Sequence, residues 1–202
     1  MIIAKPHLLV LDGQGVVFSS PIKEFLRRFS HDNLPDYKLV KHRWQENYRQ
    51  LAWTGKIGEA ELWSGLAGKP VDIVATMASL HAAYEAGPAA PHVLRWSRTV
   101  PVWLLSNHRS DWIVPKLDKL GVADAFQRLL ISDLTGFVKP EAGAYRQLLA
   151  HGLAAEDILF VDDQDRNIES AKQQGLRTIL ADNTRPWLSE IDVAIGSTAT
   201  AS

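Results

Sequence analysis

Five short runs of apolar residues constrain the fold of this chain more than any other feature. They are rich in branched residues and lack the polar alternation of a half-exposed strand, so they predict strands buried on both faces. Segments with helical spacing follow several of them, and this alternation predicts a doubly wound α/β domain with a central parallel sheet. The expected strands are HLLVL (7–11), PVWLL (101–105), RLLI (128–131), DILFV (157–161) and RTILA (177–181).

Helices are expected over 110–121, 140–152 and 166–175, between the later strands. The last two segments close on Gly152 and Gly175. Glycine is the residue that most often ends a helix, because it adopts the left-handed conformation of the C-terminal cap without strain.

The stretch 19–90 breaks the alternation of strand and helix. It holds helical patterns at 21–30, 36–53, 57–67 and 72–86 and no convincing strand. Inserted directly after the first strand, such a segment would lie over the carboxyl edge of the sheet as a small all-helical cap. We therefore expect a core domain of residues 1–18 and 91–190, a cap of 19–90, and a flexible tail of 191–202, whose residues are mostly small and polar.

Tryptophans are concentrated in the expected cap, which holds Trp44, Trp53 and Trp63 of the seven in the chain. We expect them mainly to pack between cap helices. The alternative is that they line a substrate pocket.

Polar side chains stand where three of the expected strands end. The first strand stops on Asp12, the second on Ser106, and the fourth on the pair Asp162 and Asp163. A parallel sheet gathers the carboxyl ends of its strands along one edge, where ligands bind in a crevice. These side chains and Lys139 are therefore expected to meet in one crevice.

Carboxylates held together repel one another and usually require a cation. Oxygen ligands with open positions suit Mg²⁺, which keeps waters and a substrate phosphate in its coordination shell. Ser106 and Lys139 would hold the remaining oxygens of a phosphoryl group. A carboxylate beside such a cation is arranged to form an aspartyl-phosphate.

Each of these residues also has a purely structural interpretation. Asp12 could form a turn, Ser106 could cap the following helix, Lys139 could be a solvated loop residue, and Asp162 and Asp163 could cap a helix. The combination, in this order and at these strand ends, favours a functional site.

With these motifs the chain resembles the haloacid dehalogenase superfamily of hydrolases, from the first strand to about residue 185. The strand that ends in Asp12, with Val16 four residues later, resembles the first family motif, and LLSN resembles the second. Lys139 and Pro140 resemble the third, and FVDDQDRN the fourth. The helical insertion is similar to the cap of the subgroup that contains sugar-phosphate phosphatases and the phosphatase domain of epoxide hydrolases.

The resemblance implies a role for each motif residue. In that family the first aspartate is the nucleophile and a metal ligand, the serine and the lysine bind the phosphoryl group, and the acidic pair completes the Mg²⁺ site. These roles would fall on Asp12, on Ser106 and Lys139, and on Asp162 and Asp163. The resemblance implies a small phosphorylated molecule as the substrate.

Gln14 departs from the family pattern. Phosphatases of the superfamily usually carry a second aspartate there, which protonates the leaving oxygen and then activates water. A carboxamide has no such proton, although Gln14 can still offer its backbone carbonyl to the metal. Loss of a general acid or base typically costs about 100- to 10,000-fold in rate. Asn107 and Asn167 match family positions with supporting roles, and we assign Asn107 to substrate binding.

Composition excludes several other classes of protein. The formal net charge is -1 without long runs of either sign, which predicts no nucleic-acid and no membrane-surface binding. The absence of cysteine excludes disulfides, thiolate metal sites and a cysteine nucleophile. The start, MIIAKPHLLVLDG, has no charged leader or cleavage site, so we expect a cytoplasmic protein. The sequence leaves the oligomeric state undetermined.

Two other functions compete with a phosphatase. A 2-haloacid dehalogenase needs no leaving-group proton, but the pair Asp162 and Asp163 would repel its anionic substrate. A weak or silent member of the superfamily would bind a phosphorylated metabolite or a partner, although such a protein has no need of Asp12. Substrate choice would depend on the cap, including Arg27, Arg28, Arg43 and Arg49, and on His108 and Arg109, which could face the crevice.

Overall fold

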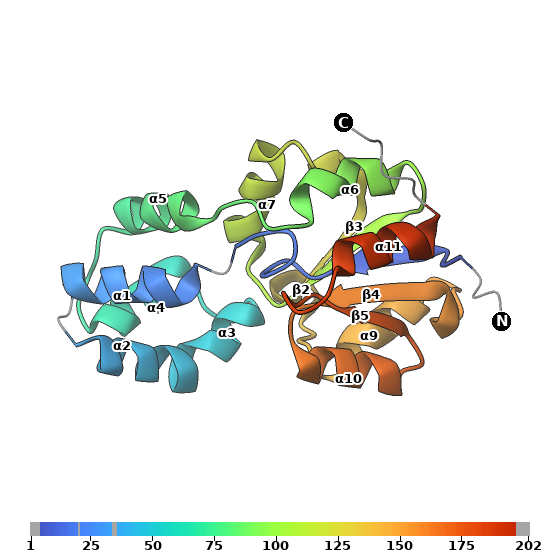
Figure 1. The fold of residues 1–202 in the computed structure, drawn as a ribbon. Helices are drawn as coiled ribbons and strands as arrows, with labels where there is room; N and C mark the ends of the chain where they lie inside the picture. Colours follow the sequence, from blue (N-terminus) through green and yellow to red (C-terminus); the bar gives the residue numbers. More distant parts are fainter. Residues whose placement is uncertain (1–4, 20, 34–35, 197–202) are drawn as a thin grey trace.

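The computed structural model describes residues 5–19, 21–33 and 36–196. A parallel sheet of five strands, in the order β3-β2-β1-β4-β5, forms its centre (Figure 1). All five predicted strands are present, within two residues of their expected bounds. They are β1 (Leu8–Leu11), β2 (Val102–Ser106), β3 (Phe126–Ile131), β4 (Ile158–Asp162) and β5 (Arg177–Leu180).

Strand β1 lies at the centre of the sheet and is buried along its whole length. It pairs with β2 on one side, where Leu11 lies opposite Leu104, and with β4 on the other, where Leu11 lies opposite Val161. The strand order reverses between these neighbours, which is where ligands bind in folds of this kind. The ends of β1, β2 and β4 therefore lie side by side.

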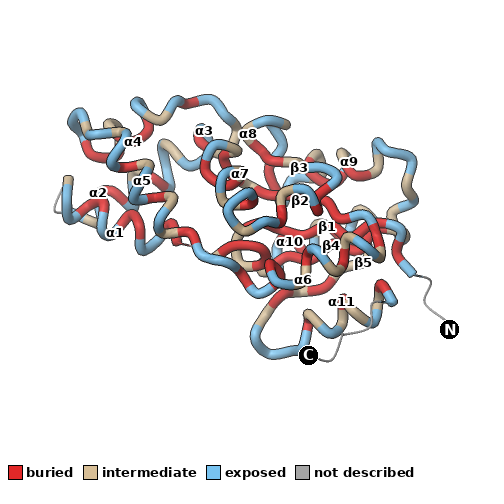
Figure 2. Tube along the Cα trace, turned by 90° about the horizontal axis from the view of Figure 1, so that it is seen from above, coloured by how far each residue is buried: buried red, intermediate tan, exposed pale blue. Residues whose placement is uncertain are grey.

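Helices cover both faces of the sheet (Figure 1). Alternate residues of β1 point to opposite faces. Leu9 and Leu11 pack with helices α6 (Ala90–Ser97), α7 (Ser110–Lys119) and α11 (Trp187–Ile195). Leu8 and Val10 pack with α9 (Ala142–Leu149) and α10 (Asp165–Gln173). The buried segments of the tube in Figure 2 follow this three-layered core.

Glycines end α9 and α10, as the sequence predicts. Gly152 has φ of 79° and donates its N–H to the carbonyl of Leu149, and Gly175 has φ of 84° and donates to Lys172. The predicted stops lie two or three residues beyond the helical bounds.

Among the described residues, the regular elements between β1 and α6 are all helices, which confirms the expected helical cap after the first strand (Figure 1). One predicted helix, 36–53, is divided by a π-helical turn. The cap elements are α1 (Ile22–Asn33), α2 (Tyr37–Arg43), the π-helix η1 (Trp44–Tyr48), α3 (Arg49–Trp53), α4 (Glu59–Ala67) and α5 (Ile73–Ala83).

The prediction of a flexible tail from residue 191 is wrong for its first part. Residues up to Ile195 belong to α11, in which Ile191 and Ile195 are fully buried against the sheet. These two residues lie four apart on one helical face, and their burial outweighs the weak helix preference of the sequence around them. Residues 197–202 lie outside the described residues.

Helix α6 and the short elements of the core were not predicted. Trp96 and Val93 anchor α6 in the core, and both are fully buried. The short elements are the 3₁₀ turns η2 (Ala123–Ala125) and η3 (Ala155–Asp157) and helix α8 (Ser132–Thr135).

Two of the three cap tryptophans pack as expected, and they also reach the core domain. Trp63 is fully buried and stacks on Trp112 of α7, with 5.5 Å between ring centroids. Trp44 is nearly buried and stacks on the same ring at 6.4 Å. The tryptophans therefore join the cap to the core.

Among the described residues, no helix combines the length and the apolar character needed to cross a membrane.

Candidate active site

The loop after β1 brings Asp12 to the carboxyl edge of the sheet, where its side chain is buried. The N–H of Gly13 donates to Asp12 Oδ1 at 2.6 Å. A Cβ on Gly13 would clash with the hydroxyl of Ser106, and a Cβ on Gly15, whose φ is 82°, would clash with the carboxylate of Asp163. The two glycines therefore allow this loop to approach the ends of both neighbouring strands.

Lys139 lies between two of the predicted carboxylates and is buried. Its Nζ donates to Asp12 Oδ1 and to Asp162 Oδ2, each at 2.6 Å. Asn107 fixes the backbone beneath it: Asn107 Nδ2 donates to the carbonyl of Lys139, and Asn107 Oδ1 accepts from its N–H, both at 2.7 Å. Both ends of the Asn107 carboxamide are thus used to position Lys139.

Asp162 is fully buried, and both of its oxygens accept hydrogen bonds. Besides Lys139, its donors are Asn167 Nδ2, at 3.0 Å from each oxygen, and the N–H of Gln164 at 2.9 Å. The carboxylate therefore also supports the turn before α10, but the N-cap residue of that helix is Gln164, so Asp162 does not act as the helix cap of its structural interpretation.

Asp163 differs from its neighbour in both respects. It is partly exposed, and its Oδ1 is buried without a hydrogen-bond partner. One carboxylate oxygen from each of Asp12, Asp162 and Asp163 lies within 4.8 Å of the others. An unsatisfied oxygen in such a cluster is a position that a hard cation fits.

The charges of the cluster are unbalanced. Burial and the nearby carboxylates of Asp162 and Asp163 raise the pKa of Asp12 to about 7, although the ammonium of Lys139 opposes this. Burial alone would lower the pKa of Lys139, but Asp12 and Asp162 outweigh burial and raise it, so the ammonium stays protonated. Burial and Asp162 raise the pKa of Asp163. One ammonium among three carboxylates leaves room for a divalent cation.

A small hollow of about 60 Å³ opens over this cluster. Ser106, buried at the end of β2, lies in its wall with Asp12 and Lys139. The other lining residues are Gln14, Trp53, Asn107, Gln164, Arg166 and Asn167. The structure therefore places five of the predicted site residues in the wall of one hollow, namely Asp12, Gln14, Ser106, Asn107 and Lys139. Asp162 and Asp163 do not line it, but each has a carboxylate oxygen within 4.8 Å of one of Asp12.

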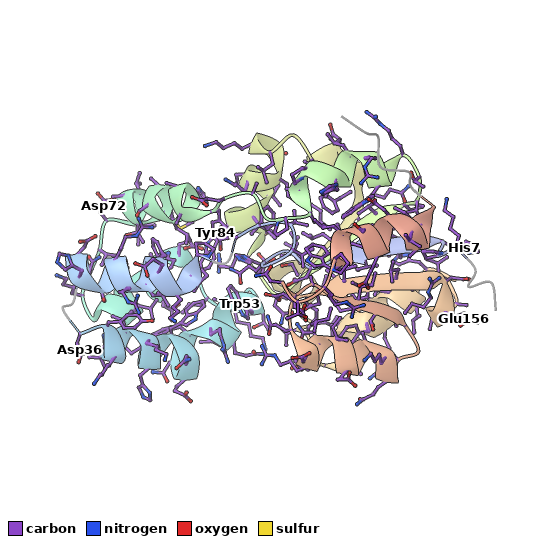
Figure 3. The ribbon with its side chains drawn as sticks, viewed as in Figure 1. His7, Asp36, Trp53, Asp72, Tyr84 and Glu156 are labelled. Atoms are coloured by element: carbon purple, nitrogen blue, oxygen red, sulfur yellow. The ribbon has the colours of Figure 1, made fainter. Side chains whose placement is uncertain are left out.

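The cap supplies Trp53, the third of its tryptophans. Trp53 ends α3, is partly exposed, and lies between the cap and the core (Figure 3). Trp53 takes the alternative role of lining the pocket, whereas Trp44 and Trp63 take the packing role. Sequence reasoning also missed Gln164 and Arg166, although both belong to the fourth motif.

Gln14 lies at the edge of the hollow, against a buried tyrosine. Its Nε2 is buried without a partner. Burial raises the pKa of Tyr84 far above its usual value, and the nearby side chain of Gln14 opposes this. The Tyr84 hydroxyl also lies 2.8 Å from Nε2 of His108. Gln14 thus lines the hollow together with Asp12, the nucleophile candidate, and keeps an unpartnered amide nitrogen.

The sequence suggested that His108 and Arg109 could face the crevice, but neither residue lines the hollow over Asp12. His108 is fully buried between Tyr84 and Trp53. Arg109 donates to the carbonyl of Ile57 at 2.7 Å and pairs with Glu59 at 2.6 Å, so it ties α7 to the cap.

This arrangement agrees with the comparison to known protein families. The sequence model of the haloacid dehalogenase-like hydrolases matches residues 14–175, which make up most of the chain. The match begins two residues after Asp12. The chain belongs to this family. The protein is therefore a hydrolase of the haloacid dehalogenase-like type, and the resemblance seen in its motifs is confirmed.

Curated relatives of this hydrolase match part of its length. Phosphoglycolate phosphatase 1 of Pseudomonas aeruginosa is 28% identical over 124 residues, which are 60% of this chain and 44% of that protein. The phosphoglycolate phosphatase of Pectobacterium atrosepticum is 32% identical over 81 residues, or 40% of this chain and 35% of that protein. The hydrolase thus spans less than half the length of these relatives.

Solved structures match the hydrolase over nearly its whole length. A HAD-like hydrolase from Porphyromonas gingivalis has a TM-score of 0.76 and 21% identity, covering 94% of this chain and 98% of the other. A HAD family enzyme from Bacteroides thetaiotaomicron, in complex with magnesium and inorganic phosphate, has a TM-score of 0.74 and 20% identity, covering 92% of this chain and 98% of the other. The L-2-haloacid dehalogenase of Xanthobacter autotrophicus has a TM-score of 0.64 and 15% identity, covering 93% of this chain and 87% of the other. At these identities the likeness shows the fold alone.

Proposed function

We propose that this hydrolase is a magnesium-dependent phosphatase that acts on a small phosphorylated metabolite through an aspartyl-phosphate at Asp12. The observation that carries the proposal is the cluster of Asp12, Asp162 and Asp163 around Lys139, beneath a hollow of about 60 Å³. Its support includes the phosphoglycolate phosphatases among the relatives and the magnesium and phosphate bound by a protein of the same fold.

Asp12, Asp163 and the carbonyl of Gln14 would hold the cation, with Asp162 in direct or water-mediated contact. The unpartnered oxygen of Asp163 and the net negative charge of the cluster fit Mg²⁺. When bound, Mg²⁺ would screen the charge of the phosphate from the carboxylate that attacks it. Since Asp162 already accepts bonds from Lys139 and Asn167, its main role would be to position the lysine.

The chain's own residues account for the two chemical steps. A carboxylate oxygen of Asp12 forms a bond to phosphorus while the bond from phosphorus to the leaving oxygen breaks. Lys139 and Ser106 lie in the wall of the hollow and would donate to the transferring phosphoryl oxygens. Water then attacks the phosphorus. The bond between phosphorus and the Asp12 oxygen breaks, phosphate is released, and the carboxylate of Asp12 is restored.

Gln14 would limit which substrates react fast. The departing oxygen needs a proton unless it is a stable anion, and a carboxamide supplies none at neutral pH. Solvent would have to provide the proton for a sugar phosphate or other alkyl ester. We therefore expect the hydrolase to favour acyl and aryl phosphates. Gln14 is also the observation that favours the alternative of a weak or silent hydrolase.

Turnover of nitrophenyl phosphate with and without Mg²⁺ tests the proposal. The wild type should require Mg²⁺, Asp12→Asn should be inactive, and Lys139→Ala should be weakened, whereas Asp165→Asn, an exposed acid of α10 outside the hollow, should keep its activity. Activity of Asp12→Asn within about tenfold of wild type would place the nucleophile elsewhere. Release of halide from 2-chloropropionate without Mg²⁺ would indicate a dehalogenase.

A further inference from the structure

The four arginines of the cap have different partners. Arg27 pairs with Glu24 at 3.0 Å, Arg28 is exposed on α1, and Arg43 donates to the carbonyl of Leu66 at 2.9 Å. Arg49 begins α3 and is exposed, and its side chain has no hydrogen bond or ion pair with any described residue. Its charge is therefore available to a ligand.

Arg49 lines a second hollow, of about 160 Å³, at the mouth of the site. This hollow shares Trp53, Asn107, Lys139 and Arg166 with the hollow over Asp12, so the two are adjacent. The first is small enough that a phosphoryl group would fill it. The rest of a substrate would therefore extend into the second, whose other residues are Gln50, Val138, Pro140 and Glu141.

The second hollow is positively charged. Arg49 and Arg166 contribute two guanidinium groups, whereas Glu141 is its one acidic lining residue among the described residues. Arg166 donates from Nε and Nη2 to the side chain of Gln164, at 3.0 and 2.8 Å, which fixes its plane and leaves Nη1 available. The charge of Lys139 is already balanced by Asp12 and Asp162.

The π-helical turn before α3 accounts for the direction of Arg49. One extra residue in a turn rotates the following residues by roughly 100° relative to a continuous α-helix. Arg49 and Trp53 are four residues apart, on one face of α3, and both line the second hollow. Turns of this type occur frequently at functional sites.

We infer that the substrate carries a second anionic group, a carboxylate, which Arg49 and Arg166 bind. This inference rests on the proposed function. Guanidinium groups match a carboxylate through pairs of parallel hydrogen bonds, and two of them, one from cap helix α3 and one from core helix α10, would fix its position. The substrate class is thus a short phosphorylated carboxylic acid, with the phosphoryl group over Asp12 and the carboxylate beneath the cap.

Calorimetric titration with two phosphonates in the presence of Mg²⁺ tests this inference. The probes are 3-phosphonopropionate, which carries a carboxylate, and propylphosphonate, which has a methyl group in its place. Wild type should bind the carboxylate probe at least about tenfold more tightly, the worth of a charge-assisted hydrogen bond. Arg49→Met and Arg166→Met should each reduce this ratio several-fold, and Arg28→Met, a cap arginine away from the hollow, should preserve it.

Two results would overturn the inference. Equal affinity of the wild type for both probes would do so and would leave the phosphatase proposal intact. An unchanged ratio in both Arg49→Met and Arg166→Met would mean that other groups make the selection. Failure of both probes to bind would overturn the phosphoryl site itself, and the proposed function with it. Circular dichroism of each variant would show that the exposed substitutions leave the fold unchanged.

Discussion

The three carboxylates at the edge of the sheet differ in the hydrogen bonds they already make. Asp162 accepts from Lys139, Asn167 and Gln164, whereas Asp163 retains a buried oxygen without a partner. A carboxylate whose oxygens already accept hydrogen bonds binds a cation less well than a carboxylate with an oxygen that accepts none. Adjacent residues of the same type therefore have different expected roles.

Asp163→Asn should weaken Mg²⁺ binding by at least about tenfold, because a hard cation loses one of its charged oxygens. Calorimetric titration of Mg²⁺ into wild type and variant would measure the change. Asp165→Asn, two residues further on and exposed, provides the control with the same loss of formal charge. Equal affinities of wild type and Asp163→Asn would remove Asp163 from the metal site.

Gln14→Asp should raise the turnover of alkyl phosphates more than that of nitrophenyl phosphate. The new carboxyl group could protonate a poor leaving oxygen, and nitrophenolate leaves without a proton, so the excess should be about tenfold or greater. The ratio of kcat/KM for an alkyl phosphate to that for nitrophenyl phosphate measures this directly. If the ratio stays constant, either another group protonates the leaving oxygen or that step does not limit the rate.

At the level of elements, the five strands and helices α7, α9 and α10 followed from the sequence because their signals are local. Apolar runs predict β1 to β5, and Gly152 and Gly175 mark the ends of α9 and α10. Helix α11 was missed because its stability depends on contacts with distant residues. Asp192 of α11 accepts from Trp96 Nε1 at 2.6 Å and pairs with Arg95 at 2.8 Å, both on α6.

The candidate site divides in the same way. Asp12, Ser106, Lys139, Asp162 and Asp163 were found from their places after strands or in motifs. The reciprocal bonds of Asn107 with Lys139 join residues 32 apart in the sequence, and the approach of Trp53 and Arg49 depends on how the cap packs. No local pattern carries that information.

Asp192→Asn should destabilise the fold by about 1–2 kcal/mol, because a partly buried charged acceptor of two hydrogen bonds is lost. Urea denaturation would give the free energy of unfolding. The matched control is Glu190→Gln on the same helix, which removes an exposed pair with Arg185 and should cost less than about 1 kcal/mol. An Asp192→Asn variant as stable as wild type would show that α11 is held by its apolar residues alone.

On the scale of the whole molecule, the cap and the core share one buried polar network. Glu59 of the cap accepts from Trp63 at 2.5 Å and from Trp112 of the core at 2.8 Å, and it pairs with Arg109. Next to this network, His108 is buried against Trp53 and Tyr84. The hollow over Asp12 is therefore bounded by an interface that contains several ionisable groups.

Buried His108 should contribute a loss of stability as the pH drops below about 6.5, whereas Asp12, whose pKa is raised to about 7, should contribute a gain over much of the same range. Burial lowers the pKa of His108 to about 3, although the carbonyl of Arg109 and the charge of Asp111 oppose the shift. The unfolded chain has the ordinary value of 6.5 and binds more protons between these limits. The contribution of His108 to stability is thus fully present above pH 6.5 and is lost toward pH 3, at up to about 1.4 kcal/mol per pH unit.

Urea denaturation of wild type and His108→Gln between pH 7.5 and pH 5 would isolate the contribution of His108, because Asp12 is present in both proteins. The wild type should lose more stability toward pH 5 than the variant does. Nuclear magnetic resonance of the wild type provides a second readout that does not depend on the variant folding. The imidazole signals of His108 should stay constant down to pH 5. A His108 signal that titrates near pH 6.5 in the folded chain would contradict the account.

The most direct test of the central claim is a crystal structure of the hydrolase with Mg²⁺ and beryllofluoride, a mimic of a phosphoryl group bound to an aspartate. The account predicts beryllium bonded to a carboxylate oxygen of Asp12, its fluorides in contact with Lys139 and Ser106, and Mg²⁺ in contact with Asp163. Beryllofluoride bonded to any other residue, or a hollow over Asp12 that takes up neither Mg²⁺ nor beryllofluoride at saturating concentration, would contradict it.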